Sequence, residues 1–173
     1  MKNIVLIGMS GVGKTTIGKS LSKVLNKEFI DMDNSISQVL GISVEEIFSL
    51  HGEAYFRRLE REFIQEIYNK EDKIISTGGG IVLNQDNMVK LKENGIIILL
   101  CGSVETLTRN ILGSTQVRPL LKDKENIRIN IETIYNIRKE LYLFNADYNI
   151  SVDNKTIDKI IYEILEKCVK INS

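Results

Sequence analysis

Cysteine, histidine and proline are scarce in this chain of 173 residues, which has two Cys, one His and one Pro. The cysteines, Cys101 and Cys168, form no Cys-x-x-Cys pair, and the sole histidine is His51. These residues are too few and too scattered to form a cysteine-histidine metal cluster. We expect both cysteines to be buried thiols in a reducing cytosol, and His51 to begin a helix without a catalytic role.

An excess of charge is also missing, because 23 Lys and Arg residues balance 23 Asp and Glu residues. The chain therefore has no global field to attract nucleic acid or an acidic membrane. The N-terminal apolar run is far too short for a signal peptide or a membrane span. We predict one cytoplasmic domain over residues 1–173, monomeric, with no nucleic-acid or membrane partner.

What the chain does have is a complete phosphate-binding motif. The stretch Gly8–Thr15 matches Gly-x-x-x-x-Gly-Lys-[Ser/Thr] in full and directly follows the apolar run Ile4–Ile7. A strand, a glycine-rich turn and a helix in this order form a phosphate site, in which Lys14 reaches the phosphates and Thr15 ligates Mg²⁺. The residues expected to bind a nucleotide here are Gly11, Val12, Gly13, Lys14, Thr15 and Thr16.

Five short apolar runs alternate with helical patterns along the chain. The runs are Ile4–Ile7, Phe29–Asp31, Lys73–Ser76, Gly95–Cys101 and Tyr148–Val152. This alternation predicts an α/β fold, a three-layer α/β/α sandwich around a five-stranded parallel sheet. Ser43 and Glu46 form a capping-box pair, and the apolar positions from Ile157 to Cys168 have the period of a helix.

Three unusual segments end on the same edge of the predicted sheet, where ligands of such folds bind. They are Gly8–Thr15, Asp31 with Asp33, and the glycine-rich stretch 77–80. Asp31 can hold Mg²⁺, and Asp33 can face a substrate hydroxyl, although Asp33 could instead cap a helix. Glycines at 78–80 let a small ligand contact backbone N–H groups, although they could instead form only a flexible turn.

Two arginines point to an anionic substrate. Arg138 lies on the apolar face of a helix predicted from about Lys124 onwards, and an inward-facing arginine needs an anion, either an ion-pair partner or a ligand. Arg57 lies at the margin of a second apolar stripe and can reach a pocket, whereas we expect Arg58 to be a surface residue. Residues 113–124 lack periodicity, contain the only proline and are predicted to form a mobile lid.

A GTPase is the first alternative, because Asn69–Asp72 matches the Asn-Lys-x-Asp guanine signature. The match precedes a strand instead of following one, which places it at the wrong edge of the sheet. The Asp-x-x-Gly element is also missing from the sequence. We interpret Asn69–Asp72 as a solvated turn and favour a small kinase.

These elements together make the chain similar to shikimate kinase over nearly its whole length. The matching elements are the Gly8–Thr15 loop, Phe29–Asp33, Gly52–Glu60, Thr77–Gly80, Val117–Leu121 and Arg138–Tyr142. The resemblance implies transfer of the γ-phosphoryl group of ATP to the 3-hydroxyl of shikimate, with Mg²⁺ held by Thr15 and Asp31. It also implies that Lys14, Asp33 and Arg118 are catalytic, with Arg118 in the lid.

The same resemblance implies roles for the binding residues. Arg57, Arg138, Gly79, Gly80 and Asp33 would hold shikimate, with the arginines on its carboxylate and Glu60 orienting Arg57. Arg109, Arg118 and Lys155 would contact ATP, with Arg109 and Lys155 on the adenine side. Two alternatives stay open: another metabolite kinase, such as a gluconate kinase, and a nucleotide-binding relative without catalysis, although the latter would be expected to lack Lys14 or Asp33.

Overall fold

The computed structural model describes residues 2–114, 119–121 and 125–169. Five parallel strands form one sheet in the order β2-β3-β1-β4-β5. Their bounds are β1 Asn3–Ile7, β2 Glu28–Asp31, β3 Lys73–Ser76, β4 Gly95–Cys101 and β5 Tyr148–Ser151. The central strand β1 pairs with β3 on one side and β4 on the other, so the sequence order reverses at β1. The loop after β1 therefore lies at the position where open α/β sheets bind ligands.

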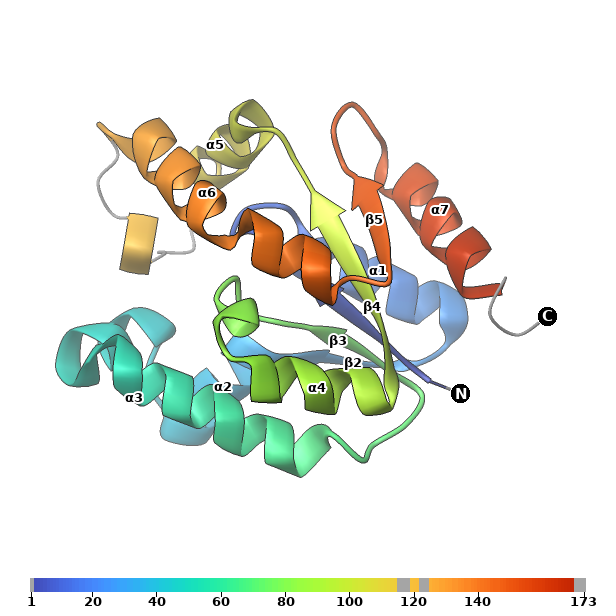
Figure 1. Ribbon diagram of the computed structural model, residues 1–173, viewed down its shortest axis with the longest axis horizontal. Helices are drawn as coiled ribbons and strands as arrows, with labels where there is room; N and C mark the ends of the chain where they lie inside the picture. Colours follow the sequence, from blue (N-terminus) through green and yellow to red (C-terminus); the bar gives the residue numbers. More distant parts are fainter. Residues whose placement is uncertain (1, 115–118, 122–124, 170–173) are drawn as a thin grey trace.

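Helices cover both faces of the sheet and complete a three-layer sandwich (Figure 1). α1 and α7 pack together on one face, whereas α3, α4 and α6 lie on the other. The helices are α1 Lys14–Leu25, α2 Met32–Leu40, α3 Val44–Ile67, α4 Gln85–Glu93, α5 Val104–Leu112, α6 Ile127–Asn145 and α7 Ile157–Val169, with short 3₁₀ turns η1 Ile81–Leu83 and η2 Pro119–Leu121. The predicted fold class is confirmed.

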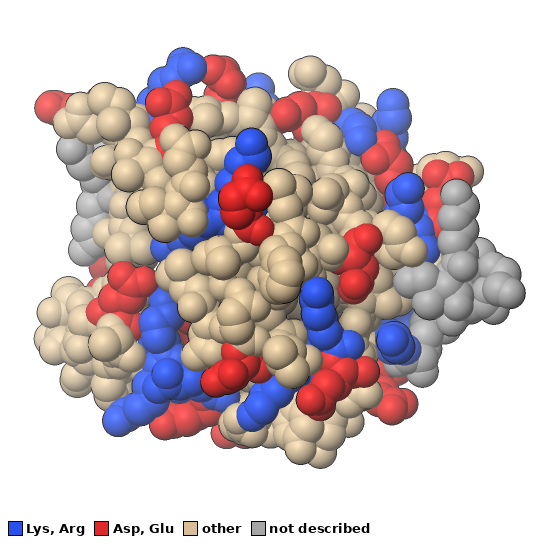
Figure 2. Space-filling model, in the orientation of Figure 1, with Lys and Arg blue, Asp and Glu red and all other residues tan. Residues whose placement is uncertain are grey.

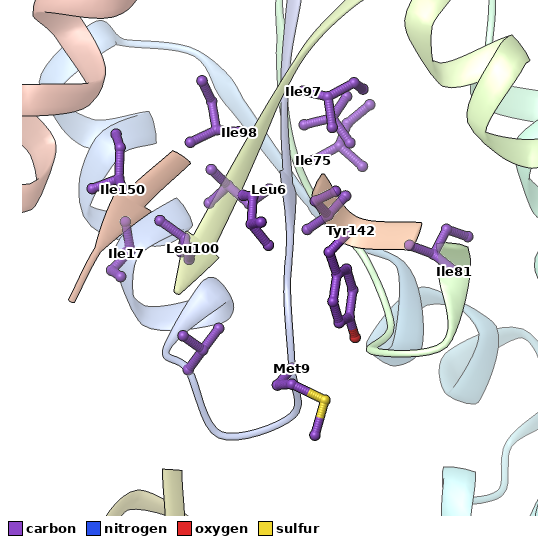
Figure 3. Packing of buried hydrophobic residues seen from close by; sticks show 14 of the residues in the cluster. Leu6, Met9, Ile17, Ile75, Ile81, Ile97, Ile98, Leu100, Tyr142 and Ile150 are labelled. Atoms are coloured by element: carbon purple, nitrogen blue, oxygen red, sulfur yellow. The ribbon is translucent and has the colours of Figure 1, made fainter. Parts of the chain in front are cut away.

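The core is a continuous apolar layer on each side of the sheet. Every residue of β1 is buried, as expected for a central strand of a parallel sheet. In Figure 3, Ile98 and Leu100 of β4 point to the side of Ile17 of α1, whereas Ile97 points to the opposite side. A second, smaller cluster around Ile47 holds α2 against α3.

Local expectations are met at several helix ends. Ser43 and Glu46 form the predicted capping box at the start of α3, with the Glu46 amide 3.2 Å from Ser43 Oγ. The helix that was expected from about Lys124 begins at Ile127. The helix cap near β2 is Asp31 and not Asp33, because the Asp31 carboxylate accepts from the Asn34 amide at 3.1 Å. Asp33 instead lines the two cavities at this edge of the sheet.

Two predictions about the scarce residues are wrong. Cys101 and Cys168 are only partly buried, at the end of β4 and in the last turn of α7. His51 does not begin a helix but lies inside α3, next to a kink at Gly52, and its ring is 4.6 Å from that of Tyr55. Its side chain is exposed, and its lack of a catalytic role stays a prediction.

The Asn69–Asp72 stretch lies between α3 and β3 with all four residues exposed. Asp72 forms an ion pair with Lys27, and the segment precedes β3, at the edge of the sheet opposite the phosphate loop. The interpretation of this stretch as a solvated turn is confirmed.

The surface carries charges of both signs close together, as the face in Figure 2 shows. None of the helices among the described residues is long and apolar enough to cross a membrane.

Candidate active site

The phosphate loop links β1 to α1 and is shaped by close contacts that only glycine permits. Gly8 and Gly11 have φ angles of 138° and 87°, which side-chain-bearing residues rarely adopt. A Cβ atom on Gly8 would collide with the Leu100 carbonyl, and one on Gly11 would lie 2.6 Å from the Ile111 side chain. Lys14, which is 8% exposed, folds back so that its ammonium group donates to the Gly8 carbonyl at 2.7 Å and the Met9 carbonyl at 3.0 Å. The loop is therefore a tight, positively charged turn at the start of a helix.

Thr15 and Asp31 lie side by side at the mouth of this loop. The Thr15 hydroxyl donates to Asp31 Oδ2 at 2.6 Å, although the two residues come from α1 and the end of β2. A hydroxyl and a carboxylate are oxygen donors of the type that Mg²⁺ prefers. The described part of the chain has no cluster of three or more His, Cys, Asp or Glu side chains that could hold a metal. Thr15 and Asp31 would suit a magnesium ion that is bound together with a phosphate ligand.

The large cavity beside the loop has a volume of about 720 Å³ and is lined by every residue that was predicted from the phosphate motif. It extends between α5 and α7, where Arg109 and Lys155 also line it. The Lys155 ammonium group is paired with Glu163 at 2.6 Å, and Arg109 is 3.4 Å from the Thr106 hydroxyl. Both cations therefore line the same cavity as the phosphate loop, and each already has a protein partner; their contact with adenine stays a prediction.

A second, smaller cavity lies between the 78–80 loop, α3 and α6. Arg57 and Arg138 line it together with Asp33, and apolar residues including Phe48, Phe56 and Leu121 surround them. Leu121 of η2 is 5% exposed, so this described part of the predicted lid packs against the core. Two guanidinium groups in an apolar surrounding form a site suited to a small carboxylate.

Arg57 is held in a fixed orientation by two acids of its own helix. Its Nε and Nη2 donate to Glu53 Oε1 at 3.1 and 2.7 Å, and its Nη1 donates to Glu60 Oε2 at 2.6 Å. The guanidinium also lies directly over Gly80, where a Cβ atom would collide with it. Glu60 orients Arg57 as predicted, and Glu53 is a second partner that the sequence did not reveal. Arg58, in contrast, is a surface residue as expected.

Glu60 is almost fully buried, with 1% exposure, and its second oxygen has no hydrogen-bond partner among the described residues. That oxygen and Asp33 Oδ1 both converge on Gly78, at 2.8 and 2.7 Å from the position that a Cβ atom would occupy. Burial raises the pKa of Glu60 to about 7, against the opposing effect of Arg57, and the nearby Asp33 carboxylate acts in the same direction as burial. Gly78 and Gly80 thus need to be glycine because charged side chains fill the space where a Cβ atom would lie.

Arg138 is 8% exposed and projects from the apolar face of α6, as its place in the sequence predicts. Its Nη1 donates to the Gly79 carbonyl at 3.1 Å, and the Tyr142 hydroxyl donates to the same oxygen. The inward arginine therefore has a backbone partner, and its charge also acts on the buried Glu60 carboxylate, where it opposes the effect of burial on the pKa.

The two cavities meet at three shared residues, which are Ser10, Asp33 and Gly79. Asp33 thus lies at the junction between the phosphate loop and the arginine-lined cavity. A hydroxyl group bound beside Asp33 would face the phosphate loop. The structure brings together all predicted site residues that it describes. Arg118 and residues 115–118 and 122–124 of the predicted lid lie outside the described residues.

Sequence reasoning missed one further residue on the nucleotide side. The side-chain amide of Asn110 in α5 donates to the Gly11 carbonyl at 2.9 Å and so ties α5 to the phosphate loop. The two residues are 99 positions apart, and no local pattern marks Asn110. Tyr142 was missed as well, although its position one helical turn after Arg138 could have indicated a shared face.

A phosphate loop at the central strand, an adjacent Thr–Asp pair and a connected arginine-lined cavity define a P-loop small-molecule kinase. Comparisons with known proteins make this assignment specific. The model of the family described as shikimate kinase matches residues 10–169. The shikimate kinase of Caldanaerobacter subterraneus subsp. tengcongensis is 43% identical over 99% of this chain and 98% of the relative. That of Sulfurihydrogenibium sp. is 41% identical over 96% of this chain and 98% of the relative. The chain belongs to the shikimate kinase family.

Comparisons with solved structures support the same family. The shikimate kinase from Acinetobacter baumannii in complex with shikimate superposes with a TM-score of 0.92 at 31% identity, covering 98% of this chain and 94% of that one. A gluconokinase from Sinorhizobium meliloti reaches a TM-score of 0.60 at 16% identity, over 98% of this chain and 93% of that one. At 16% identity, the similarity to the gluconokinase shows a common fold and nothing more.

Proposed function

We propose that this protein transfers the γ-phosphoryl group of ATP to the 3-hydroxyl of shikimate, giving shikimate 3-phosphate and ADP. The observation that carries the proposal is the junction of the two cavities at Asp33, with a phosphate loop on one side and two arginines on the other. Shikimate is a small alcohol with a carboxylate, and such a molecule needs both an anion site and a place for its reacting hydroxyl. The family to which the chain belongs supports the same acceptor.

At the nucleotide end, Lys14 and the N–H groups of residues 11–16 would hold the ATP phosphates. Thr15 and Asp31 would hold Mg²⁺, which neutralises charge on the phosphate oxygens when bound. Arg109 and Lys155 would line the adenine side, and Lys155 would have to share its charge with Glu163. Arg118, in the lid over about 113–124, would reach the transferring group and help to exclude water.

At the acceptor end, Arg57 and Arg138 would bind the shikimate carboxylate through paired N–H groups, and the 79–80 backbone would contact the ring. Asp33 would accept a hydrogen bond from the attacking hydroxyl and take its proton as the bond to phosphorus forms. Because phosphoryl transfer needs little covalent chemistry from the protein, positioning and charge supply most of the rate enhancement. We place this reaction in the cytoplasm and expect the monomer to be the active unit.

The test is an assay of ADP release with shikimate, gluconate and nucleoside monophosphates as acceptors, each at several concentrations. A reaction without acceptor measures the background hydrolysis of ATP. We expect the kcat/KM for shikimate to exceed the others by at least about a hundredfold, because the site favours an acceptor whose carboxylate and reacting hydroxyl reach the two arginines and Asp33 at the same time. Comparable or faster ADP release with gluconate would favour the alternative kinase, and acceptor-independent rates throughout would contradict the proposed function.

A further inference from the structure

Tyr142 is a buried polar residue that the proposed chemistry does not use. Its side chain is 1% exposed and projects from α6 into the core, with Ile81 to one side and Met9 beyond its hydroxyl oxygen (Figure 3). Four residues earlier on the same helix, Arg138 projects from the same face. A phenylalanine would fill the apolar part of this position equally well, so the hydroxyl group requires an explanation.

The hydroxyl group of Tyr142 connects two parts of the acceptor cavity. It donates to the Gly79 carbonyl, which also accepts from Arg138 Nη1 at 3.1 Å. Tyr142 and Arg138 also interact directly, and the arginine opposes the effect of burial, which raises the pKa of Tyr142 to about 12. The hydroxyl therefore keeps its proton throughout the physiological range and remains a donor to Gly79.

The other side of Gly79 rests on the phosphate loop. A Cβ atom on Gly79 would lie 3.1 Å from the Ser10 nitrogen and 3.7 Å from the Gly8 carbonyl. The Gly79–Gly80 peptide is thus fixed between α6 and the phosphate loop, at the junction of the two cavities. Since the chain has no cis peptide among its described residues, the Gly80 N–H points opposite to the carbonyl that Tyr142 holds. Neither Gly79 nor Gly80 donates a backbone hydrogen bond within the described part of the chain.

We propose that Tyr142 is a positioning residue of the acceptor site, whose hydroxyl fixes the Gly79 carbonyl and Arg138 relative to each other. When the Gly79 carbonyl is held in place, the backbone N–H groups of the 78–80 loop point in one fixed direction. The Arg138 guanidinium is then also held in one orientation, in which its remaining N–H groups face the acceptor cavity. Tyr142 acts through these two groups and touches no substrate. This inference rests on the proposed function only for the identity of the acceptor.

The test compares Tyr142→Phe with Tyr135→Phe, which removes a hydroxyl from the same helix at a partly buried position that lines neither the nucleotide cavity nor the acceptor cavity. Loss of one hydrogen bond to a buried carbonyl should raise the KM for shikimate about five- to tenfold in Tyr142→Phe. The KM for ATP should stay within about twofold, and Tyr135→Phe should match the wild type. The preference for shikimate over its methyl ester should also fall in Tyr142→Phe, because Arg138 is less well oriented.

A purely structural role for Tyr142 would lower the melting temperature without separating the two KM values. That result, or an unchanged KM for shikimate, would overturn the inference. If the wild type itself fails to phosphorylate shikimate, the proposed function fails instead, and the two failures are therefore distinguishable.

A second measurement does not depend on the stability of the phenylalanine variant. A chain with 3-fluorotyrosine at position 142 alone should show a ¹⁹F resonance that shifts on addition of shikimate and moves less with an ATP analogue. A resonance insensitive to shikimate would contradict the inference.

Discussion

The nucleotide cavity and the acceptor cavity share an edge of the sheet but are built in different ways. The phosphate end of the nucleotide cavity comes from one continuous stretch, residues 10–17. The acceptor cavity is lined by residues from six separate segments, which are the phosphate loop, α2, α3, the 78–80 loop, η2 and α6. The phosphate end therefore depends mainly on one local turn, whereas the acceptor cavity exists only when the six segments are packed together.

The charged residues of the two sites also differ in whether their partners are local or come from other segments. Lys14 is held by backbone carbonyls of its own loop, whereas Arg57 and Arg138 depend on partners such as Glu60, Glu53 and the Gly79 carbonyl. Changes in the phosphate loop should therefore affect the chemical step with little effect on acceptor binding. Changes around the acceptor cavity should mainly affect the affinity for one substrate. The predictions below test this separation.

The largest effect is expected at Asp33, where the two cavities meet. Asp33→Asn keeps the shape of the side chain and removes the charge that accepts a proton, so kcat should fall by about 10²–10⁴. ATP should still bind with its normal affinity, measured by calorimetry, and Asp86→Asn on α4 should behave as the wild type. A kcat close to normal would remove Asp33 from the catalytic role.

The next largest effect is expected at Lys14. Lys14→Met removes a preorganised charge aimed at the transferring group and should lower kcat by about 10²–10³, with the KM for shikimate changed little. Lys19→Met on the exposed side of α1 is the control. If Lys14→Met unfolded the protein but left the activity per folded molecule intact, the lysine would be structural and the assignment of the phosphate loop wrong.

Smaller effects are expected at the arginines, on affinity and not on rate. Arg138→Lys and Arg57→Lys keep a charge and lose the planar pair of donors, so the KM for shikimate should rise about tenfold while the KM for ATP stays near its normal value. Arg128→Lys, at an exposed position of α6, provides the comparison. An equal rise in both KM values would show that the cavities are not separable.

The last prediction concerns stability and pH instead of activity. Because burial raises the pKa of Glu60 from its usual 4.5 to about 7, the folded state binds more protons than the unfolded state between these values. The wild type should therefore lose stability as the pH rises from about 5 to 8, by about 2–3 kcal/mol from this group. Urea titrations of Glu60→Gln should show a flatter pH profile, and Glu62→Gln, exposed on the same helix, should retain the slope. Identical slopes for all three proteins would refute the raised pKa.

This difference between the two cavities explains which site residues could be predicted from the sequence. The phosphate loop, Asp31 and Asp33 each follow an apolar run directly. Because such a run predicts a strand, this sequence order was enough to place them at the same edge of the sheet. Arg138 was predictable because a charge interrupts an apolar helical stripe. Asn110, Glu53 and Tyr142 were missed as partners, since the bonds of Asn110 and Tyr142 cross 99 and 63 positions of the chain. Contacts across such distances are set by the packing of helices on the sheet. Glu53, in contrast, lies four residues before Arg57 on the same helix, and this spacing could have indicated the ion pair.

The most direct test of the central claim is the comparison of shikimate with its methyl ester, which differ only in the charge that the arginines are proposed to bind. The kcat/KM of each should be measured for the wild type, Arg57→Lys and Arg138→Lys. We expect the ester to be a poor substrate of the wild type, and the ratio of acid to ester to shrink in both variants, because the paired hydrogen bonds are already lost. Equal handling of acid and ester by the wild type would contradict the carboxylate clamp.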